Sequence, residues 1–587
     1  MPILCSQRIN MRICYQSLFH FLFILMVDCT PPEDPIKCSS GTRNCIITNT
    51  YGMFPDRSIC REANAAYPTS EDEIIQAVAF ATKSRKKMKV TTRYSHSIPK
   101  LVCPDDEDGL IISTKYLNRT LRIDQSAMMM TMESGLTLRQ LINEAAKAGL
   151  ALPYAPYFWG MTLGGMLGTG AHGSSLWGKG SSIHDYVVGL RIVTPGGPED
   201  GFAKVRVLDH GQADLEAAKV SLGVLGVISQ VTLKLQPLFK RSITYLIRND
   251  SDLADEAASY GNQHEFADIT WYPSQRKAVY KKDDRVSTNI SGNGVNDFTG
   301  FQSTLTIELA ANRALEESQE ATKNGDGKCS TSRLITSLLS ATAYGLKNNG
   351  LAFIGYPVVG YQNRLQSSGS CLDSLEDELI TACPWDPRVK GQFFHQTTLS
   401  IGLSNVKSFI QDVQKLVDLE PNSLCGVELY NGILMRYVKA SSAYLGKQED
   451  GIDFDITYYR SKDPMIPRLY EDILEEIEQI GVFKYGGLPH WGKNRNIAFD
   501  GVIRKYRNAE QFLKVKKVYD PDALFSSEWT DQILGLKDGL EIVKDGCALE
   551  GLCICSQDSH CAPSEGYFCR PGKVYQGARV CTRLNSK

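Results

Sequence analysis

The chain has 587 residues, 42% of them hydrophobic, which is enough apolar material for more than one core. Lys and Arg number 64 against 66 Asp and Glu, so there is no basic excess to neutralise phosphates or anionic lipid. We therefore expect at least two domains and no nucleic-acid partner. The basic cluster Lys83, Arg85, Lys86, Lys87 and Lys89 is interpreted as a solvated face at the end of a helix.

The N-terminus has the pattern of a secretory signal. Basic residues precede a largely apolar run from Leu18 to Val27, and a polar, proline-rich stretch follows. The run is too short to span a bilayer, so residues 1–29 are predicted to be a cleaved signal peptide. We expect entry into the secretory pathway, with an extracellular, cell-wall or vacuolar destination and no stable membrane span. Met11 is an alternative start, and a buried helix or strand is the competing interpretation of the run.

Cysteine usage is consistent with an oxidising compartment. Fourteen cysteines remain after the signal, some of them in a Cys-containing lead over residues 30–53. Six crowd a tail over 541–587, namely Cys547, Cys553, Cys555, Cys561, Cys569 and Cys581. This tail is too poor in apolar residues for a core of its own, which predicts disulfides. Zinc is the alternative, but paired CxxC elements are missing and no metal is expected. Asn118, Asn249 and Asn289 are possible glycosylation acceptors.

Between residues 54 and 239, helix and strand patterns alternate. Ser70 with Glu73 is typical of a capping box that opens a helix, and Thr137 with Gln140 is predicted to open another. Strands are predicted over 89–93, 110–113 and 128–133. The run Met128 to Met130 is interpreted as core filling rather than as a copper site, since no His or Cys spacing supports a metal.

Residues 240–485 differ, with longer and more polar segments that predict a second domain. Helices are expected over 406–416 and 469–480, and a strand over 454–459. A return segment over 486–540 precedes the Cys-rich tail. The fold class predicted is α+β, because sheets covered by helices on one side account for both halves.

The strongest chemical signal is the glycine-rich stretch from Thr162 to Gly173. Its glycines remove side chains and permit positive φ, so that successive backbone N–H groups can approach an anionic group such as a diphosphate. The spacing matches neither the P-loop nor the GxGxxG fingerprint, and a purely structural turn is the competing interpretation.

Two further segments support a nucleotide site. Arg93-Tyr-Ser-His-Ser97 follows a predicted strand, and a glycine-bearing segment from Ser221 runs into another at Ile228. In this order the three segments resemble the vanillyl-alcohol-oxidase-like flavoproteins. The resemblance implies a two-subdomain FAD-binding PCMH-type domain, an α+β substrate (cap) domain and a small disulfide-rich tail. The residues it assigns to FAD are Arg93, Tyr94, Ser95, His96, Ser97, Thr162, Gly164, Gly165, Gly168, Thr169, Gly170, His172, Gly173, Gly223, Gly226 and Ile228. His96 matches the position that bonds the flavin 8α carbon in many members; Phe158 and Trp159 stand where some relatives add a cysteinyl bond.

Further downstream, Leu488-Pro-His-Trp-Gly-Lys493 resembles the HWxK motif of the aldonolactone oxidoreductases, and Tyr519 to Phe525 resembles their return segment. With the Cys-rich ends, the mature chain is similar to the plant L-gulonolactone oxidase-like proteins. This implies oxidation of L-gulono-1,4-lactone or a similar aldonolactone by FAD, leading to L-ascorbate. The electron acceptor would be O2, giving H2O2, or another molecule.

The same resemblance suggests roles for individual residues. Lys493 would supply positive charge near the flavin or the substrate hydroxyl, and His490 would orient the lactone or shuttle its proton. Related alditol oxidases carry a Glu-x-Arg pair and a downstream Thr, which Glu428 and Thr457 match; the arginine position is then Tyr430, and Arg436 is the substitute cation. Lys115 stands where glycine or alanine is expected, which leaves oxidase and dehydrogenase both open.

Two other functions remain as alternatives. An oxidase of other sugars or oligosaccharides, as among berberine-bridge-like proteins, is disfavoured by the HWxK motif. A non-catalytic extracellular flavin-fold binding protein is compatible with Tyr430 and Lys115.

Overall fold

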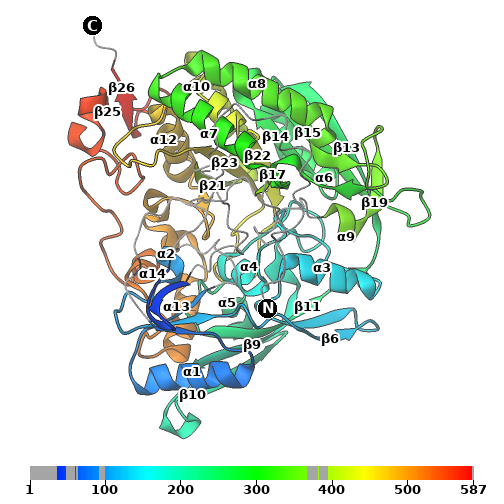
Figure 1. Cartoon of the computed structure of the whole chain (residues 1–587), viewed down its shortest axis with the longest axis vertical. Coiled ribbons are helices and arrows are strands. Elements are labelled where there is room, and N and C mark those ends of the chain that lie inside the picture. The colour runs from blue at the N-terminus through cyan, green and yellow to red at the C-terminus, as the bar shows by residue number, and fades with distance from the viewer. Residues whose placement is uncertain are drawn as a thin grey trace, which may run out of the picture.

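The structure is a computed structural model that describes residues 36–47, 60, 64–91, 99–366, 381–382 and 394–584. The predicted signal peptide lies outside these residues, as does the Arg93–Ser97 segment with His96. Figure 1 shows two sheet-containing halves stacked along the long axis, with the chain's C-terminal tail beside the upper half.

The lower half holds two N-terminal sheets on either side of one helix. Strands β3 (Asn64–Ala66), β5 (Leu110–Ser113) and β4 (Met88–Thr91) form a parallel sheet. An antiparallel sheet has the order β10 (Ala203–Asp209), β9 (Val187–Pro195), β11 (Val227–Lys234), β7 (Met129–Glu133) and β6 (Thr120–Asp124). Helix α1 (Glu71–Lys83) contacts both sheets, because Ile74, Val78 and Ala81 are buried on one face at helical spacing.

The capping predictions hold with one correction. Thr137 and Gln140 form a full capping box at α3 (Leu138–Lys147). Ser70 accepts from the Glu73 amide as predicted, but the Glu73 carboxylate turns to Thr69 instead of completing the box. Met130 is fully buried in β7, as expected of core filling.

The basic cluster that follows α1 is only partly a solvated face. Lys83 and Arg85 are exposed, but Lys89 points into the protein from β4 and is fully buried. Helical spacing no longer applies once the chain enters a strand, so the prediction for Lys89 was wrong. Burial lowers the pKa of Lys89 to about 7.

The upper half is built on an eight-stranded sheet that begins with β13 at Lys240. Its order is β19 (Val358–Tyr361), β13 (Lys240–Asn249), β15 (Lys277–Val286), β14 (Asp268–Tyr272), β22 (Ile433–Val438), β23 (Gly451–Tyr459), β21 (Phe394–Gly402) and β24 (Leu488–Pro489). Helices α6 (Leu253–Gln263), α10 (Leu403–Leu419) and α12 (Glu471–Gln479) share one apolar core with the sheet. Two further helices, α7 (Thr306–Ala321) and α8 (Gly325–Ala341), lie at the top of Figure 1.

The chain then returns to the lower half. After β24, helices α13 (Ala509–Tyr519) and α14 (Glu528–Ile533) place Phe512, Tyr519 and Ile533 in the core of the N-terminal sheets. The Met88 amide of β4 donates to the Leu524 carbonyl at 2.7 Å. The segment that contains the HWxK motif therefore physically joins the two halves.

The Cys-rich tail is held by three disulfides, 547–553, 555–569 and 561–581. Because all six cysteines are bonded in pairs, none of them offers a thiolate to zinc. The hairpin of β25 (Tyr567–Pro571) and β26 (Arg579–Arg583) packs on α12, where Glu475 accepts from the Cys581 amide at 2.7 Å. The lead and the body contain the further disulfides 38–45, 60–103 and 329–425.

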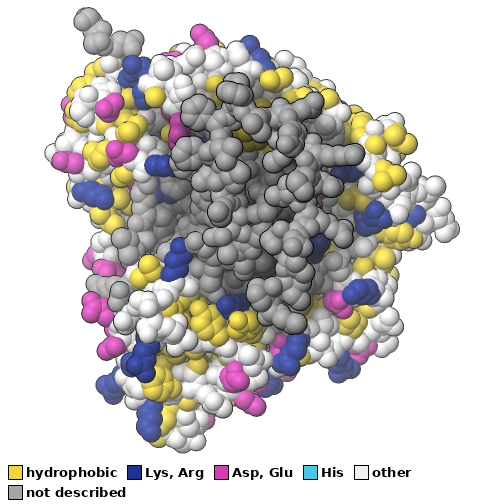
Figure 2. All heavy atoms as spheres, viewed as in Figure 1, with side chains coloured by type: hydrophobic (Ala, Val, Ile, Leu, Met, Phe, Trp, Pro, Cys, Tyr) yellow, Lys and Arg dark blue, Asp and Glu magenta, His cyan; other side chains and the backbone are white. Residues whose placement is uncertain are grey.

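Within the described residues, no helix has both the length and the apolar character needed to cross a bilayer. On the face shown in Figure 2, basic and acidic side chains are interspersed rather than gathered by sign.

Candidate active site

The eight-stranded sheet has two chemically different faces. On β23, Phe454 and Ile456 point into the core beneath α10, whereas Asp453, Asp455 and Thr457 alternate with them and point the other way. Side chains alternate across a strand, so this second face should be solvated in an ordinary half-exposed sheet. Asp453 and Asp455 are nevertheless buried, which places a polar, enclosed layer between the sheet and the lower half.

Ionisable side chains crowd this buried layer. The cations are Arg241, Lys281, Arg436, Lys447 and Lys493, and the carboxylates are Asp268, Asp283, Asp453 and Asp455. Taking charges out of water costs several kcal/mol per ion unless they are paired, so proteins rarely bury such a set without a functional reason. The cations exceed the carboxylates by one, and the excess lies where Arg436 and Lys493 share Asp455.

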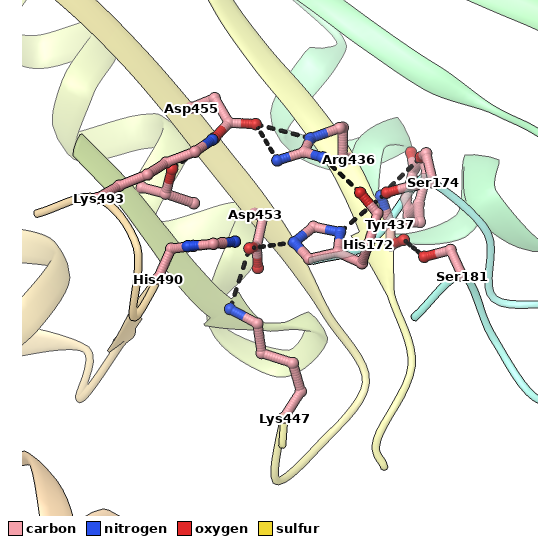
Figure 3. A network of polar contacts seen from close by, with 12 residues as sticks. His172, Ser174, Ser181, Arg436, Tyr437, Lys447, Asp453, Asp455, His490 and Lys493 are labelled. Atoms are coloured by element: carbon pink, nitrogen blue, oxygen red, sulfur yellow. Dashed lines mark hydrogen bonds and ion pairs between the residues drawn. The ribbon is translucent and has the colours of Figure 1, made fainter. Parts of the chain in front are cut away.

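The shared carboxylate joins the predicted lysine to the sheet. Lys493 Nζ donates to Asp455 Oδ1 at 2.7 Å, and Arg436 Nε donates to Asp455 Oδ2 at 2.6 Å (Figure 3). Thr398 on β21 also donates to Asp455. The two cations hold the pKa of Asp455 well below its usual range, against the opposing effect of burial. Burial lowers the pKa of Lys493, and Asp455 opposes this by stabilising its charged form.

A second carboxylate links the sheet to the glycine-rich stretch. His172 Nε2 lies 2.9 Å from Asp453 Oδ2, and Lys447 Nζ donates to the same oxygen at 3.0 Å. Arg436 Nη1 donates to the His172 carbonyl at 2.8 Å. In the view of Figure 3, His490 and His172 lie on opposite sides of Asp453, and their ring centroids are 6.0 Å apart. Burial lowers the pKa of His490 well below its usual value, and it also lowers the pKa of His172, where Asp453 acts in the opposite direction.

The glycine-rich stretch forms helix α4 (Leu163–Thr169) and a tight turn behind it. Gly170 ends the helix at φ +69°, and a Cβ on Gly173 would lie 2.6 Å from the Ala155 carbonyl oxygen, so neither position suits a side chain. Gly492 of the HWxK motif packs on Thr169, where a Cβ would lie 3.3 Å from the threonine Cβ. The two motifs that the sequence separates by more than three hundred residues are therefore in contact.

The surroundings of α4 fit a ligand rich in hydrogen-bonding groups. The hydroxyls of Ser113, Ser134 and Thr162 are buried and have no hydrogen-bond partner within the part of the chain that the structure describes. The Gly164 amide donates to the Ser134 carbonyl at 2.7 Å, which places α4 beside Ser134. Buried polar atoms are almost always bonded, so these hydroxyls fit the phosphate and ribose oxygens of a dinucleotide such as FAD.

The glycine-bearing segment that begins at Ser221 contacts the glycine-rich stretch. The Leu222 amide donates to the Gly168 carbonyl at 3.0 Å, so the segment that contains Gly223 lies against α4. Gly226 has φ +142°, and a Cβ there would lie 2.4 Å from the Val193 carbonyl oxygen. This glycine is required for the approach of β11 to β9, and Ile228 is buried in β11.

Glu428 and Tyr430 are not joined to the Lys493 network by any contact among the described residues. Glu428 accepts from the amides of Ser274 and Gln275 at 2.7 and 3.3 Å, while Tyr430 donates to Glu316 at 2.8 Å. The sequence predicted that Tyr430 would stand near Lys493 and that a cation would be missing there. In the structure Arg436 lies near Lys493 instead, because it belongs to β22, which pairs with β23, whereas Tyr430 precedes β22. Glu428 as a catalytic residue stays a prediction.

Sequence reasoning missed Asp453, Asp455 and Lys447. The signal that could have found the two aspartates is their alternation with apolar residues in Gly451–Tyr459, since a strand with one apolar face and two acids on the other needs partners. Lys447 carries no comparable pattern, because it reaches Asp453 from a loop.

Comparison with known proteins agrees with this arrangement. The "FAD binding domain" family matches residues 63–198, and the "D-arabinono-1,4-lactone oxidase" family matches residues 390–533. The solved "Solvent-stable cholesterol oxidase" has a TM-score of 0.62 at 17% identity, covering 84% of this chain and 97% of that one. That likeness shows the fold alone. Fold and site together define an FAD-dependent oxidoreductase with a PCMH-type FAD-binding domain.

Relatives in the plant Arabidopsis thaliana narrow the class. "Probable L-gulonolactone oxidase 6" is 67% identical over 95% of this chain and 92% of its own length, and "L-gulonolactone oxidase 2" is 65% identical over 97% and 98%. The tail at 544–583 matches the family "L-gulonolactone oxidase 2-like, C-terminal domain". The chain belongs to the L-gulonolactone oxidase family. The "L-gulono-1,4-lactone dehydrogenase" of Mycobacterium tuberculosis is 26% identical over 83% of the chain.

Proposed function

We propose that this protein oxidises L-gulono-1,4-lactone, or an aldonolactone close to it, with FAD as the hydride acceptor. The proposal depends on the Arg436–Asp455–Lys493 triad, in which Arg436 and Asp455 are buried and Lys493 is half-buried. The HWxK motif brings Lys493 to the face of the sheet that lies toward α4. The names of the relatives support the lactone as substrate.

The residues of the site can do two things for such a reaction, beside the chemistry that FAD supplies. FAD, when bound, accepts the hydride that the lactone's alcohol carbon gives up. Lys493 and Arg436 hold positive charge that one carboxylate does not cancel, and this charge would favour the negative charge that the flavin gains with the hydride and that the substrate oxygen gains as its proton leaves. Asp455 keeps both cations in place before substrate arrives, so little reorganisation is needed during the reaction.

Anaerobic reduction of the flavin tests the proposal directly. L-Gulono-1,4-lactone should bleach the visible flavin spectrum of the purified protein, and Lys493→Met should slow this step at least a hundredfold, since one positioned charge contributes on that scale. Lys147→Met is the matched control, because Lys147 is 73% exposed in a surface pair with Glu144. A spectrum unchanged by every aldonolactone and alditol would overturn the lactone assignment and favour the other-sugar oxidase or the non-catalytic binding protein.

We also propose that the FAD is bonded through its 8α carbon to His96. Support comes from the order of the three segments and from the match of residues 63–198 to an FAD-binding family. Yellow colour should remain with acid-precipitated protein, and His96→Ala should release it into the supernatant. Flavin that washes out of the unaltered protein would remove the covalent bond from the account.

The electron acceptor is proposed to be O2, giving H2O2. Lys115 Nζ lies 4.6 Å from the ring centroid of Tyr67 and 5.0 Å from that of Tyr116. These cation–π contacts hold the Lys115 side chain against two surface tyrosines. This placement supports access of oxygen to the flavin, although Lys115 replaces the glycine or alanine that was expected there. Air should reoxidise lactone-reduced protein rapidly and release H2O2. Reoxidation that requires a quinone or dye would identify a dehydrogenase instead.

The secretory pathway is the proposed location. The disulfides of the lead, body and tail support an oxidising compartment. Asn249 and Asn289 are exposed and Asn118 is half-buried. Expression in plant cells should yield a glycosidase-sensitive protein whose N-terminus begins near Thr30. An unglycosylated protein that retains residues 1–29 would reject this location.

A further inference from the structure

His490 is held in one orientation by its own loop. The Gly492 amide donates to His490 Nδ1 at 3.0 Å, and the His490 amide donates to Asn494 Oδ1 at 3.0 Å. Asn494 is fastened to β21 through Nδ2, which donates to Thr397 Oγ1 at 2.7 Å and to the Thr398 carbonyl at 2.9 Å. The ring is therefore fixed relative to the strand that also contacts Asp455.

The hydrogen bond from Gly492 decides which nitrogen carries the proton. A ring nitrogen that accepts a hydrogen bond has no proton of its own, so the neutral imidazole must carry its proton on Nε2. Burial, Lys493 and His172 lower the pKa of His490 well below its usual value, with Lys447 acting in the same direction and Asp453 opposing. The ring therefore does not gain a second proton near neutral pH.

Nε2 of His490 makes no hydrogen bond to any residue within the described ranges of the chain. In the view of Figure 3 the ring lies across Asp453 from His172, and Lys493, His172 and Asp453 all act on its pKa. We propose that His490 is a fixed Nε2–H donor to an oxygen of the bound lactone, and that it does not take the proton of the substrate hydroxyl. This inference rests on the proposed function, because it assigns the donor a substrate oxygen as its partner.

Two isosteric substitutions separate a donor from a base. In His490→Gln the amide nitrogen replaces Nε2 as a donor, whereas in His490→Asn the amide overlies Nδ1 and leaves the Nε2 position empty. We expect anaerobic flavin reduction by lactone to stay within about tenfold of the unaltered rate in His490→Gln, and to fall about ten- to a hundredfold in His490→Asn and His490→Ala, the effect of one lost substrate hydrogen bond. His264→Gln, at a half-buried histidine paired with Asp284, is the control and should not change the rate.

The pH profile adds a readout that a packing role would not change. The reduction rate of His490→Gln should keep the same acidic limb as the unaltered protein, since His490 does not titrate in that range. If His490 were the base, the limb would disappear in His490→Gln and the glutamine variant would be as slow as the alanine variant. Either of these results would overturn the proposal.

Nitrogen NMR on ring-labelled histidine tests the tautomer without turnover. The signal lost in His490→Gln identifies His490, and it should report an unprotonated Nδ1 and a protonated Nε2 from pH 5.5 to 8.5. A His490 that titrates between these values, or that carries its proton on Nδ1, would refute the inference even if lactone is the substrate. If instead no lactone reduces the flavin, the proposed function fails while the tautomer assignment is still decided by this measurement.

Discussion

Replacing Asp455 with asparagine should damage stability and shift the pH dependence of catalysis together. The side chain is buried and bonded to Arg436, Lys493 and Thr398, so Asp455→Asn leaves the buried Arg436 and the half-buried Lys493 without their carboxylate. Removing one partner of a buried ion pair costs about 3–5 kcal/mol, because the remaining charge stays desolvated. We expect the free energy of unfolding, from denaturant titration of the holoprotein, to fall by that amount.

The catalytic consequence follows from the pKa of Lys493. Burial lowers that pKa and Asp455 raises it, so loss of the carboxylate should lower it further. Lys493 must be protonated to stabilise developing negative charge, and its charge is lost as pH rises through its pKa. The alkaline limb of anaerobic flavin reduction should therefore move to lower pH in Asp455→Asn.

The control is Asp124→Asn, which removes the same charge from a surface pair with Arg122. It should change neither the denaturation midpoint nor the pH profile appreciably. An alkaline limb that does not move in Asp455→Asn, with flavin content intact, would show that Asp455 does not set the charge of Lys493 and that the triad is structural.

Three further predictions concern the scaffold. Lys89→Met should stabilise the protein by up to about 5 kcal/mol near pH 6, where folding buries a charge that has no hydrogen-bond partner among the described residues. The gain should shrink as pH rises from 7 towards 10.5, and a gain that is independent of pH would refute the lowered pKa of Lys89. Cys561→Ser with Cys581→Ser opens a loop of 20 residues and should cost about 3 kcal/mol in denaturant titration, so an unchanged midpoint would mean that the tail unfolds separately. Gly173→Ala should lower the flavin content and reduce the free energy of unfolding by about 1–3 kcal/mol. Gly168→Ala is the control, because its added methyl meets open space, and it should leave the fold of the flavin-free protein intact. Equal effects of both substitutions would contradict the close approach of Gly173 to Ala155.

Local patterns in the sequence were enough for many of the elements. The residues at Thr137 and Gln140 fix a helix start because capping involves atoms only three residues apart, and the structure has that box. Apolar spacing likewise located α10 and β23, although the helix is longer at both ends than predicted. The disulfide tail and the glycine-rich stretch followed from composition, since a segment with few apolar residues needs covalent links and a glycine-rich turn permits close approach.

What the sequence alone determined is that a glycine-rich nucleotide loop and a distant HWxK lysine belong to one FAD-dependent lactone oxidoreductase. Only the tertiary structure decided that Asp455 and Arg436, not Tyr430, surround that lysine, and that Asp453 ties His172 to Lys447. The physical reason is that strand order sets these partners: β22, β23 and β21 are neighbours in the sheet, and the spacing of residues along the chain does not reveal which strands will pair. Burial of Lys89 was decided in the same way, by the residues that β4 meets across the fold rather than by the basic cluster around it.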